Sequence, residues 1–171
     1  MMKSVTHFPN CIQDRLHWTD FVSMINYAYD KKNPNGSNYG SKEIVGSVNF
    51  WHKLTMTVDL FSPEMNARLT KMYEDMSELI KTGPLAGFFA VISLTGHEGT
   101  TGRHTDPVDI AYWQCVGRAV WSTFDGEVKS EYELKPGDII CVGAGTLHEV
   151  RSTTPRAAVS FMIHPRRRVL P

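Results

Sequence analysis

Residues 134–150 read LKPGDIICVGAGTLHEV, and this stretch indicates the fold. Two predicted short strands, 138–142 and 148–151, begin in it, with a Pro-Gly turn before the first and a Gly-Ala-Gly turn between them. Further predicted short strands follow Pro84, with glycine or proline between them, at residues 88–94, 109–116, 119–124, 131–134 and 157–163. Many short strands at this spacing are typical of a β-sandwich or barrel. The sequence therefore predicts a small jelly-roll barrel with residues 85–164 as its core.

The first 84 residues have a different pattern, with two expected helices and two expected strands. Residues 14–29 carry apolar side chains at helical spacing, with Asp14 or Thr19 as the expected cap. A second helix is expected from Ser62, with Pro63 in its first turn. Its apolar stripe consists of Met65, Leu69, Met72, Met76, Leu79 and Ile80. Residues 44–50 and 54–60 are predicted strands, the second half-buried with Met56 and Val58 inward. We expect the helices to pack outside the barrel.

Length and charge limit the choice of function. The 171 residues are most simply one domain, in which residues 1–84 support the barrel core and residues 165–171 form a basic tail exposed to solvent. Lys and Arg total 18, and Asp and Glu total 18, so the formal net charge is zero. No overall field favours nucleic acid or an anionic membrane, and neither is an expected partner. The sequence does not predict an oligomeric state.

The cysteines and the apolar runs favour a cytoplasmic protein. Cys11, Cys115 and Cys141 are too widely spaced for a zinc motif or a disulfide framework, and the last two lie in apolar runs typical of a core. No secretion signal and no apolar run of membrane-spanning length are expected. Residues 31–42 are polar and rich in turn formers, so we expect either a plain surface loop or a lid over a site.

His104, Asp106 and His148 form the predicted metal site. Residues 103–107 read RHTDP, and side chains two apart on a strand point to the same side. Two imidazoles and one carboxylate on one face of a metal leave its other positions open, as in non-haem Fe(II) oxygenases. Taken singly, each histidine would be interpreted as a hydrogen-bonded structural residue. His97 and Glu98 are alternative ligands, but they lie in a glycine-rich segment without strand context.

The order of these motifs resembles that of JmjC-type Fe(II)/2-oxoglutarate oxygenases. Residues 104–121 match the first metal segment of that family, which consists of His-x-Asp, a strand with Gln, and then Gly and an aromatic residue. Residues 134–148 match the second half of the family's motif, which consists of a Pro-Gly-Asp turn, a strand, a glycine turn and the second histidine. This half is also similar to the second cupin motif, with Gly143 in place of its proline. The resemblance covers about residues 88–163.

The resemblance implies a double-stranded β-helix, Fe(II) held by His104, Asp106 and His148, and 2-oxoglutarate as co-substrate. Oxygen would convert 2-oxoglutarate to succinate and CO₂ while a prime substrate, not identifiable from the sequence, is hydroxylated. The protein would supply the open coordination face, the anchor for the co-substrate and a dry pocket.

Arg156 is the predicted anchor for the distal carboxylate of 2-oxoglutarate. Residues 148–161 are similar to the end of prolyl-hydroxylase-like oxygenases, in which an arginine on the last strand follows the second metal histidine. Arg156, Ala158 and Ser160 share one strand face, so a guanidinium and a hydroxyl could reach one carboxylate. Arg151 is the alternative anchor, and Arg156 could instead be a surface arginine after a turn.

Other positions are assigned through the same resemblance or by strand alternation. Thr101 matches a hydroxyl that JmjC-type enzymes use on the co-substrate, whereas Ala119 stands where many of them have a co-substrate lysine. Tyr112 shares a strand face with Ile110 and Gln114 and could line the pocket. Three other aromatic residues, Trp113, Trp121 and Phe124, are expected to pack in the core.

Two alternatives stay open at the level of sequence. One is a cupin-like metal protein that does not use 2-oxoglutarate: an isomerase, a different dioxygenase or a ligand-binding module. The other is a sugar- or protein-binding jelly roll that retains the same residues without catalysis. Fold does not decide between them, because one fold hosts many functions.

Overall fold

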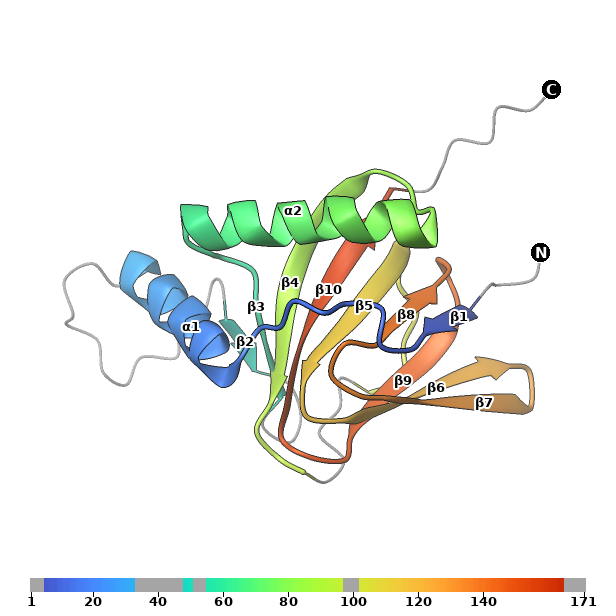
Figure 1. Ribbon diagram of the computed structural model, residues 1–171. Helices are drawn as coiled ribbons and strands as arrows, with labels where there is room; N and C mark the ends of the chain where they lie inside the picture. Colours follow the sequence, from blue (N-terminus) through green and yellow to red (C-terminus); the bar gives the residue numbers. More distant parts are fainter. Residues whose placement is uncertain (1–4, 33–47, 51–54, 97–101, 165–171) are drawn as a thin grey trace.

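The computed structural model describes residues 5–32, 48–50, 55–96 and 102–164, and it folds into two antiparallel sheets with two helices (Figure 1). In chain order the elements are β1 (Val5–Phe8), α1 (Trp18–Lys32), β2 (Val48–Phe50), β3 (Thr55–Val58), α2 (Pro63–Ile80), β4 (Leu85–Ser93), β5 (Asp109–Val116), β6 (Ala119–Asp125), β7 (Val128–Leu134), β8 (Ile139–Val142), β9 (Leu147–Ser152) and β10 (Arg156–Ile163). The larger sheet has the order β1-β8-β5-β10-β4-β3-β2, and the smaller sheet has the order β7-β6-β9. This is the predicted double-stranded β-helix with flanking helices.

The larger sheet is buried on both faces, and period-2 alternation assigns each side chain to one of them. On β5, Trp113 belongs to the core shared with the helices, whereas its neighbour Tyr112 belongs to the core between the two sheets. On β10, Val159 and Phe161 face the helices, and Ala158 faces the smaller sheet. Figure 1 shows α2 crossing β4, β10 and β5 on the side away from the smaller sheet. The face of the larger sheet opposite the helices is therefore the face that is turned toward the smaller sheet.

Helix α2 follows its predicted start. The Ser62 hydroxyl accepts a hydrogen bond from the Met65 amide at 3.2 Å, and Pro63 stands in the first turn. Lys81, with φ of 53°, ends the helix in the left-handed conformation. The predicted stripe is wrong at Leu79, which is exposed, and it omitted Tyr73, which is buried in the middle of the helix. The tyrosine ring packs on Phe161 of the sheet below.

Helix α1 begins at Trp18 rather than at residue 14, and neither Asp14 nor Thr19 caps it. The His17 carbonyl accepts the Asp20 and Phe21 amides, and the Asp20 carboxylate in turn accepts the His17 amide at 2.7 Å. This exchange is the reciprocal part of a capping box, in which the acid of the first turn reaches back to the start. The helix ends at Lys32, so the predicted loop 31–42 begins in a helix, and its remaining residues lie outside the described ranges.

The N-terminal strands differ from the prediction in two places. Strand β1, which was not predicted, pairs with β8 at the edge of the larger sheet. Strand β3 falls inside the predicted segment 54–60, and β2 is the described part of the predicted segment 44–50. On β3 the polar Thr55 is fully buried instead of facing solvent, because its hydroxyl donates to the Ser93 hydroxyl of β4 at 3.2 Å.

Cys11, Cys115 and Cys141 are free thiols, as expected, and burial raises the pKa of Cys141 to about 12. Within the described ranges, no helix has the length and apolar character needed to cross a membrane.

Gly117 allows the β5–β6 turn to lie directly against the turn that leads into β10. Its φ is +70°, and a side chain there would collide with the Pro155 carbonyl and approach the Thr154 hydroxyl at 2.7 Å and the Arg156 Cα at 3.0 Å. The Thr154 hydroxyl also accepts the Arg118 amide at 2.8 Å. The absence of a Cβ at Gly117 therefore determines how closely the start of β10 approaches β5.

We predict that Gly117→Ala destabilises the protein more than Gly126→Ala. Both glycines have a left-handed φ, but Gly126 has open space where a Cβ would stand. Gly126→Ala should cost about 1–2 kcal/mol of backbone strain. Gly117→Ala should add an overpacking cost of about 1–3 kcal/mol. Urea denaturation of both variants measures the difference, and equal free energies of unfolding would contradict the close approach.

Candidate metal centre

A two-way backbone bridge places His104 beside His148. The amide of each histidine donates to the carbonyl of the other at 2.9 Å, which makes an isolated β-bridge. His148 lies on β9, and His104 lies in the segment leading into β5. The bridge brings together the two motifs that the sequence places far apart.

The glycine turn before β9 is fastened to the segment that carries the carboxylate. The Gly145 amide donates to the Asp106 carbonyl at 2.8 Å, and the Ala144 amide donates to the Asp109 carboxylate at 2.7 Å. These bonds fix the backbone of all three candidate ligands relative to one another. Preorganised ligands of this kind are what a metal site needs.

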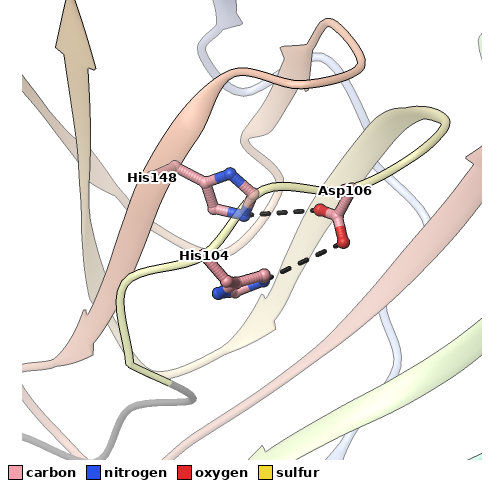
Figure 2. A group of neighbouring side chains, drawn as sticks. All are labelled: His104, Asp106 and His148. Carbon is pink, nitrogen blue, oxygen red and sulfur yellow. Dashed lines mark ion pairs between the residues drawn. The ribbon is translucent and has the colours of Figure 1, made fainter.

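The three side chains converge with their ligand atoms facing inward (Figure 2). His148 Nε2 lies 3.4 Å from one Asp106 oxygen, and His104 Nε2 lies 3.9 Å from the other. All their ligating atoms lie within 4.8 Å of one another. Such separations suit neighbouring ligands around one divalent ion.

Each histidine is oriented by a carbonyl of its own chain. His104 Nδ1 lies 2.9 Å from the Gly102 carbonyl, and His148 Nδ1 lies 2.9 Å from the Thr146 carbonyl. Because a carbonyl only accepts, each Nδ1 carries the proton and each Nε2 keeps its lone pair for a metal. The donor set of two imidazole nitrogens and one carboxylate fits a mononuclear non-haem Fe(II) ion and leaves coordination positions open.

Burial differs among the three ligands. His148 is 2% exposed, whereas the side chains of His104 and Asp106 are 38% and 30% exposed. Burial, the largest effect, lowers the pKa of His148, and the nearby His104 lowers it further. The hydrogen bond to the Thr146 carbonyl and the Asp106 carboxylate both raise the pKa, but the net change is downward. The neutral imidazole that a metal requires is therefore the favoured form of His148 at neutral pH.

A cavity of about 310 Å³ between the sheets connects this group to a buried arginine. Its lining residues are Thr57, Phe89, Val91, His104, Asp106, Ile110, Tyr112, Trp121, His148, Val150, Arg156 and Ser160. Arg156, predicted as the anchor, is 1% exposed. Its Nε donates to the Ser152 hydroxyl at 2.8 Å, and its Nη1 donates to the Tyr112 hydroxyl. Among the described residues, no carboxylate pairs with this guanidinium.

Tyr112 and Ser160, both predicted near the co-substrate, are buried in the same cavity. Burial raises the pKa of Tyr112, and the Arg156 charge opposes the rise. The phenol therefore stays protonated at neutral pH. Its oxygen accepts from Arg156, so its proton is available to a second acceptor.

The alternative anchor Arg151 lies elsewhere. Its guanidinium binds Glu131 at 3.0 Å on the outer face of the smaller sheet, and it does not line the cavity. Gln114, expected on the pocket face with Tyr112, donates instead to the Val116 and Gly117 carbonyls of its own turn. Three further candidates, Thr101, His97 and Glu98, lie outside the described residues.

Trp121 packs in the core between the two sheets, as expected. It also lines the cavity and stacks on His148, a role that the sequence did not predict. Its position as the aromatic residue after the glycine of the predicted metal motif was visible in the sequence, whereas its contact with His148 was not. Trp113 packs in the helix-side core as expected, and Phe124 lies under the Arg103 guanidinium.

Comparison with known proteins supports the fold. No protein-family model and no curated protein matches the sequence. The ribosomal oxygenase YcfD of Escherichia coli superposes with a TM-score of 0.65 at 16% identity, over 96% of this chain and 50% of YcfD. The structure of YcfD in complex with cobalt and 2-oxoglutarate gives a TM-score of 0.62 at 17% identity, over 96% of this chain and 49% of YcfD. The non-haem α-ketoglutarate-dependent epimerase SnoN of nogalamycin biosynthesis gives 0.59 at 14% identity, over 98% and 83%.

The chain thus spans about half the length of YcfD and most of SnoN. At these identities the similarity concerns the fold. The chain shares the fold of YcfD and SnoN, and this fold is the double-stranded β-helix that the sequence motifs predicted.

We predict that His104→Ala and His148→Ala each abolish stoichiometric binding of Fe(II), because two ligands cannot hold the ion as three do. Anaerobic titration with Fe(II), or with Co(II) as a spectroscopic substitute, measures the stoichiometry. His17→Ala is the matched control, since this histidine is exposed at the start of α1. Circular dichroism verifies that the variants fold. Stoichiometric binding by both site variants would refute the assignment.

Proposed function

We propose that this protein is an Fe(II)- and 2-oxoglutarate-dependent oxygenase, and in particular a hydroxylase. The net reaction converts 2-oxoglutarate, O₂ and a substrate R–H to succinate, CO₂ and R–OH. The proposal is supported by one cavity that contains both a His-Asp-His group and the buried guanidinium of Arg156. It is also supported by the fold shared with YcfD, which has been solved with cobalt and 2-oxoglutarate.

The observation that carries the proposal is the burial of Arg156 without an acidic partner. A guanidinium removed from water is costly unless a counter-charge compensates it. Here two neutral hydroxyls bind the guanidinium, and among the described residues no carboxylate does. The missing counter-charge would come from a bound anion, and the cavity that reaches the metal group is where that anion can enter.

The charge balance of the cavity specifies the anion further. A divalent metal, the Asp106 carboxylate and the Arg156 guanidinium together leave two positive charges, with both histidines neutral. A dicarboxylate neutralises both if one end reaches the metal and the other reaches Arg156. 2-Oxoglutarate is such a molecule, and its keto-acid end can occupy two of the open metal positions.

Each group in the cavity then has a distinct role. His104, Asp106 and His148 would hold Fe(II), which when bound supplies the redox chemistry with oxygen. Arg156 would pair with the distal carboxylate, and the Tyr112 and Ser160 hydroxyls would donate to the same oxygens. Apolar walls that include Val91, Ile110 and Val150 would exclude water from the reacting end. Thr101 remains a further candidate for co-substrate binding from the sequence.

We predict that Arg156→Ala weakens 2-oxoglutarate binding at least tenfold while Fe(II) affinity changes little. Truncating one partner of a buried charge pair costs about 2–5 kcal/mol. Arg156→Lys should recover part of the affinity, because an ammonium keeps the charge but cannot form the bidentate fork. Calorimetry with Mn(II) in place of Fe(II) measures the affinity for the metal and for 2-oxoglutarate without turnover.

Arg151→Ala is the matched control for this experiment, because Arg151 follows the same metal histidine but binds Glu131 at the surface. Its 2-oxoglutarate affinity should equal that of the wild type. If Arg151→Ala abolished binding and Arg156→Ala did not, the anchor would be Arg151 and the assignment would be wrong.

We also predict that the protein forms succinate from 2-oxoglutarate slowly without its prime substrate. The assay contains Fe(II), oxygen and ascorbate, and His148→Ala supplies the background rate. No succinate, together with no 2-oxoglutarate binding by calorimetry, would reject the oxygenase. The protein would then be a cupin-like metal protein that does not use 2-oxoglutarate.

A further inference from the structure

Trp121 contacts both halves of the cavity. It extends from β6 and is 2% exposed. Its ring lies nearly parallel to the His148 imidazole, with centroids 4.9 Å apart and an interplanar angle of 17°. The same ring meets Tyr112 edge-on, with centroids 5.0 Å apart and an angle of 65°. One indole therefore links a metal ligand to the phenol that binds Arg156.

The His148 imidazole has few other constraints on its plane. Its Nδ1 binds the Thr146 carbonyl, which fixes one point of the ring, and its Nε2 must stay free for a metal. The His104 ring lies at 57° to it, with centroids 4.4 Å apart, and is itself partly exposed. The Trp121 face is the buried flat surface against which the His148 ring rests.

Tyr112 is constrained in the same way. Its hydroxyl accepts from Arg156 Nη1, and its ring edge contacts the indole. An edge-to-face aromatic pair contributes about 0.5–1.5 kcal/mol beyond area burial. A movement of Trp121 would therefore shift the imidazole that faces the metal and the phenol that faces the anion together.

The aromatic face of Trp121, rather than its N–H group, makes these contacts. The buried indole Nε1 has no hydrogen-bond partner among the described residues. Packing alone therefore holds the ring. Phenylalanine would preserve an aromatic face at this position, and leucine would not.

We infer that Trp121 is a positioning residue that fixes the His148 ring plane and the Tyr112 hydroxyl as one unit. It acts through these two residues, so metal geometry and anion affinity depend on a single side chain. The anion part of this inference rests on the proposed function, whereas the metal part requires only that His148 binds a metal.

The first test measures the geometry in the wild-type protein without metal. Stacking on an indole shields the imidazole carbon-bound protons of His148, so their NMR signals should lie upfield of those of the exposed His17. His148 signals at ordinary positions would overturn the inference without any variant having to fold.

The second test compares Trp121→Leu with Trp121→Phe. Changing groups that orient a metal ligand typically costs about 10–100-fold in metal affinity. Trp121→Leu should lose at least tenfold in Co(II) affinity, alter the visible spectrum of bound Co(II) and weaken 2-oxoglutarate binding. Trp121→Phe should restore the spectrum and most of both affinities. Thermal denaturation separates these effects from a loss of folding.

Failure of the Trp121 inference can be told apart from failure of the proposed oxygenase function. If the wild type binds Co(II) but not 2-oxoglutarate, the oxygenase proposal fails, and the effect of Trp121→Leu on the Co(II) spectrum still tests the positioning role. Wild-type behaviour of Trp121→Leu would overturn the inference. So would a Trp121→Phe variant as impaired as Trp121→Leu, because the indole N–H would then be the active group.

Discussion

The backbone bridge between His104 and His148 is the constraint on which the candidate site depends. Two reciprocal hydrogen bonds of 2.9 Å join a segment entering the larger sheet to a strand of the smaller one. The bridge therefore ties the two sheets together at the point where the ligands project. The Gly145 and Ala144 amides extend this connection to Asp106 and Asp109. These bonds fix the backbone of the site, and side-chain contacts such as the stacking of Trp121 on His148 then set the orientation of the rings.

The burial of the Arg156 guanidinium, in contrast to the backbone bridge, lowers the stability of the fold. Replacing buried ionic groups by well-packed apolar residues is often neutral or stabilising. An unpaired guanidinium in a cavity is therefore hard to explain by folding alone. Natural proteins tolerate such groups where function needs them, and binding energy from an anion would offset the cost when the cavity is filled. One cavity contains Arg156 together with the Tyr112 and Ser160 hydroxyls. This arrangement is consistent with a stability cost that anion binding would offset.

The fold and most of the site could be predicted from the sequence because turns and alternation are local properties. Glycine and proline bounded the strands after Pro84, and β5 had its observed limits, Asp109–Val116. Local patterns did not reveal contacts between distant segments. The burial of Thr55 depends on Ser93 of the neighbouring strand. The start of α1 depends on the Asp20 side chain, which accepts the His17 amide. The role of Trp121 depends on His148, which lies on the neighbouring strand β9. Strand β1 is too short for a reliable pattern and is defined by its pairing with β8.

The alternation that makes prediction possible also makes the site sensitive to strand register. A slip of one residue on β10 would exchange Ser160 for Phe161 and carry the polar side chain into the helix-side core. The pairing of β10 with β5 changes register between Ala157 and Ala158, next to Arg156. An extra residue on β5, Cys115, is accommodated there, and Gly117 lets the adjoining turns touch. Such bulges commonly redirect side chains beside functional sites. Arg156 thus lies between an irregular pairing and a turn that has no room for a side chain.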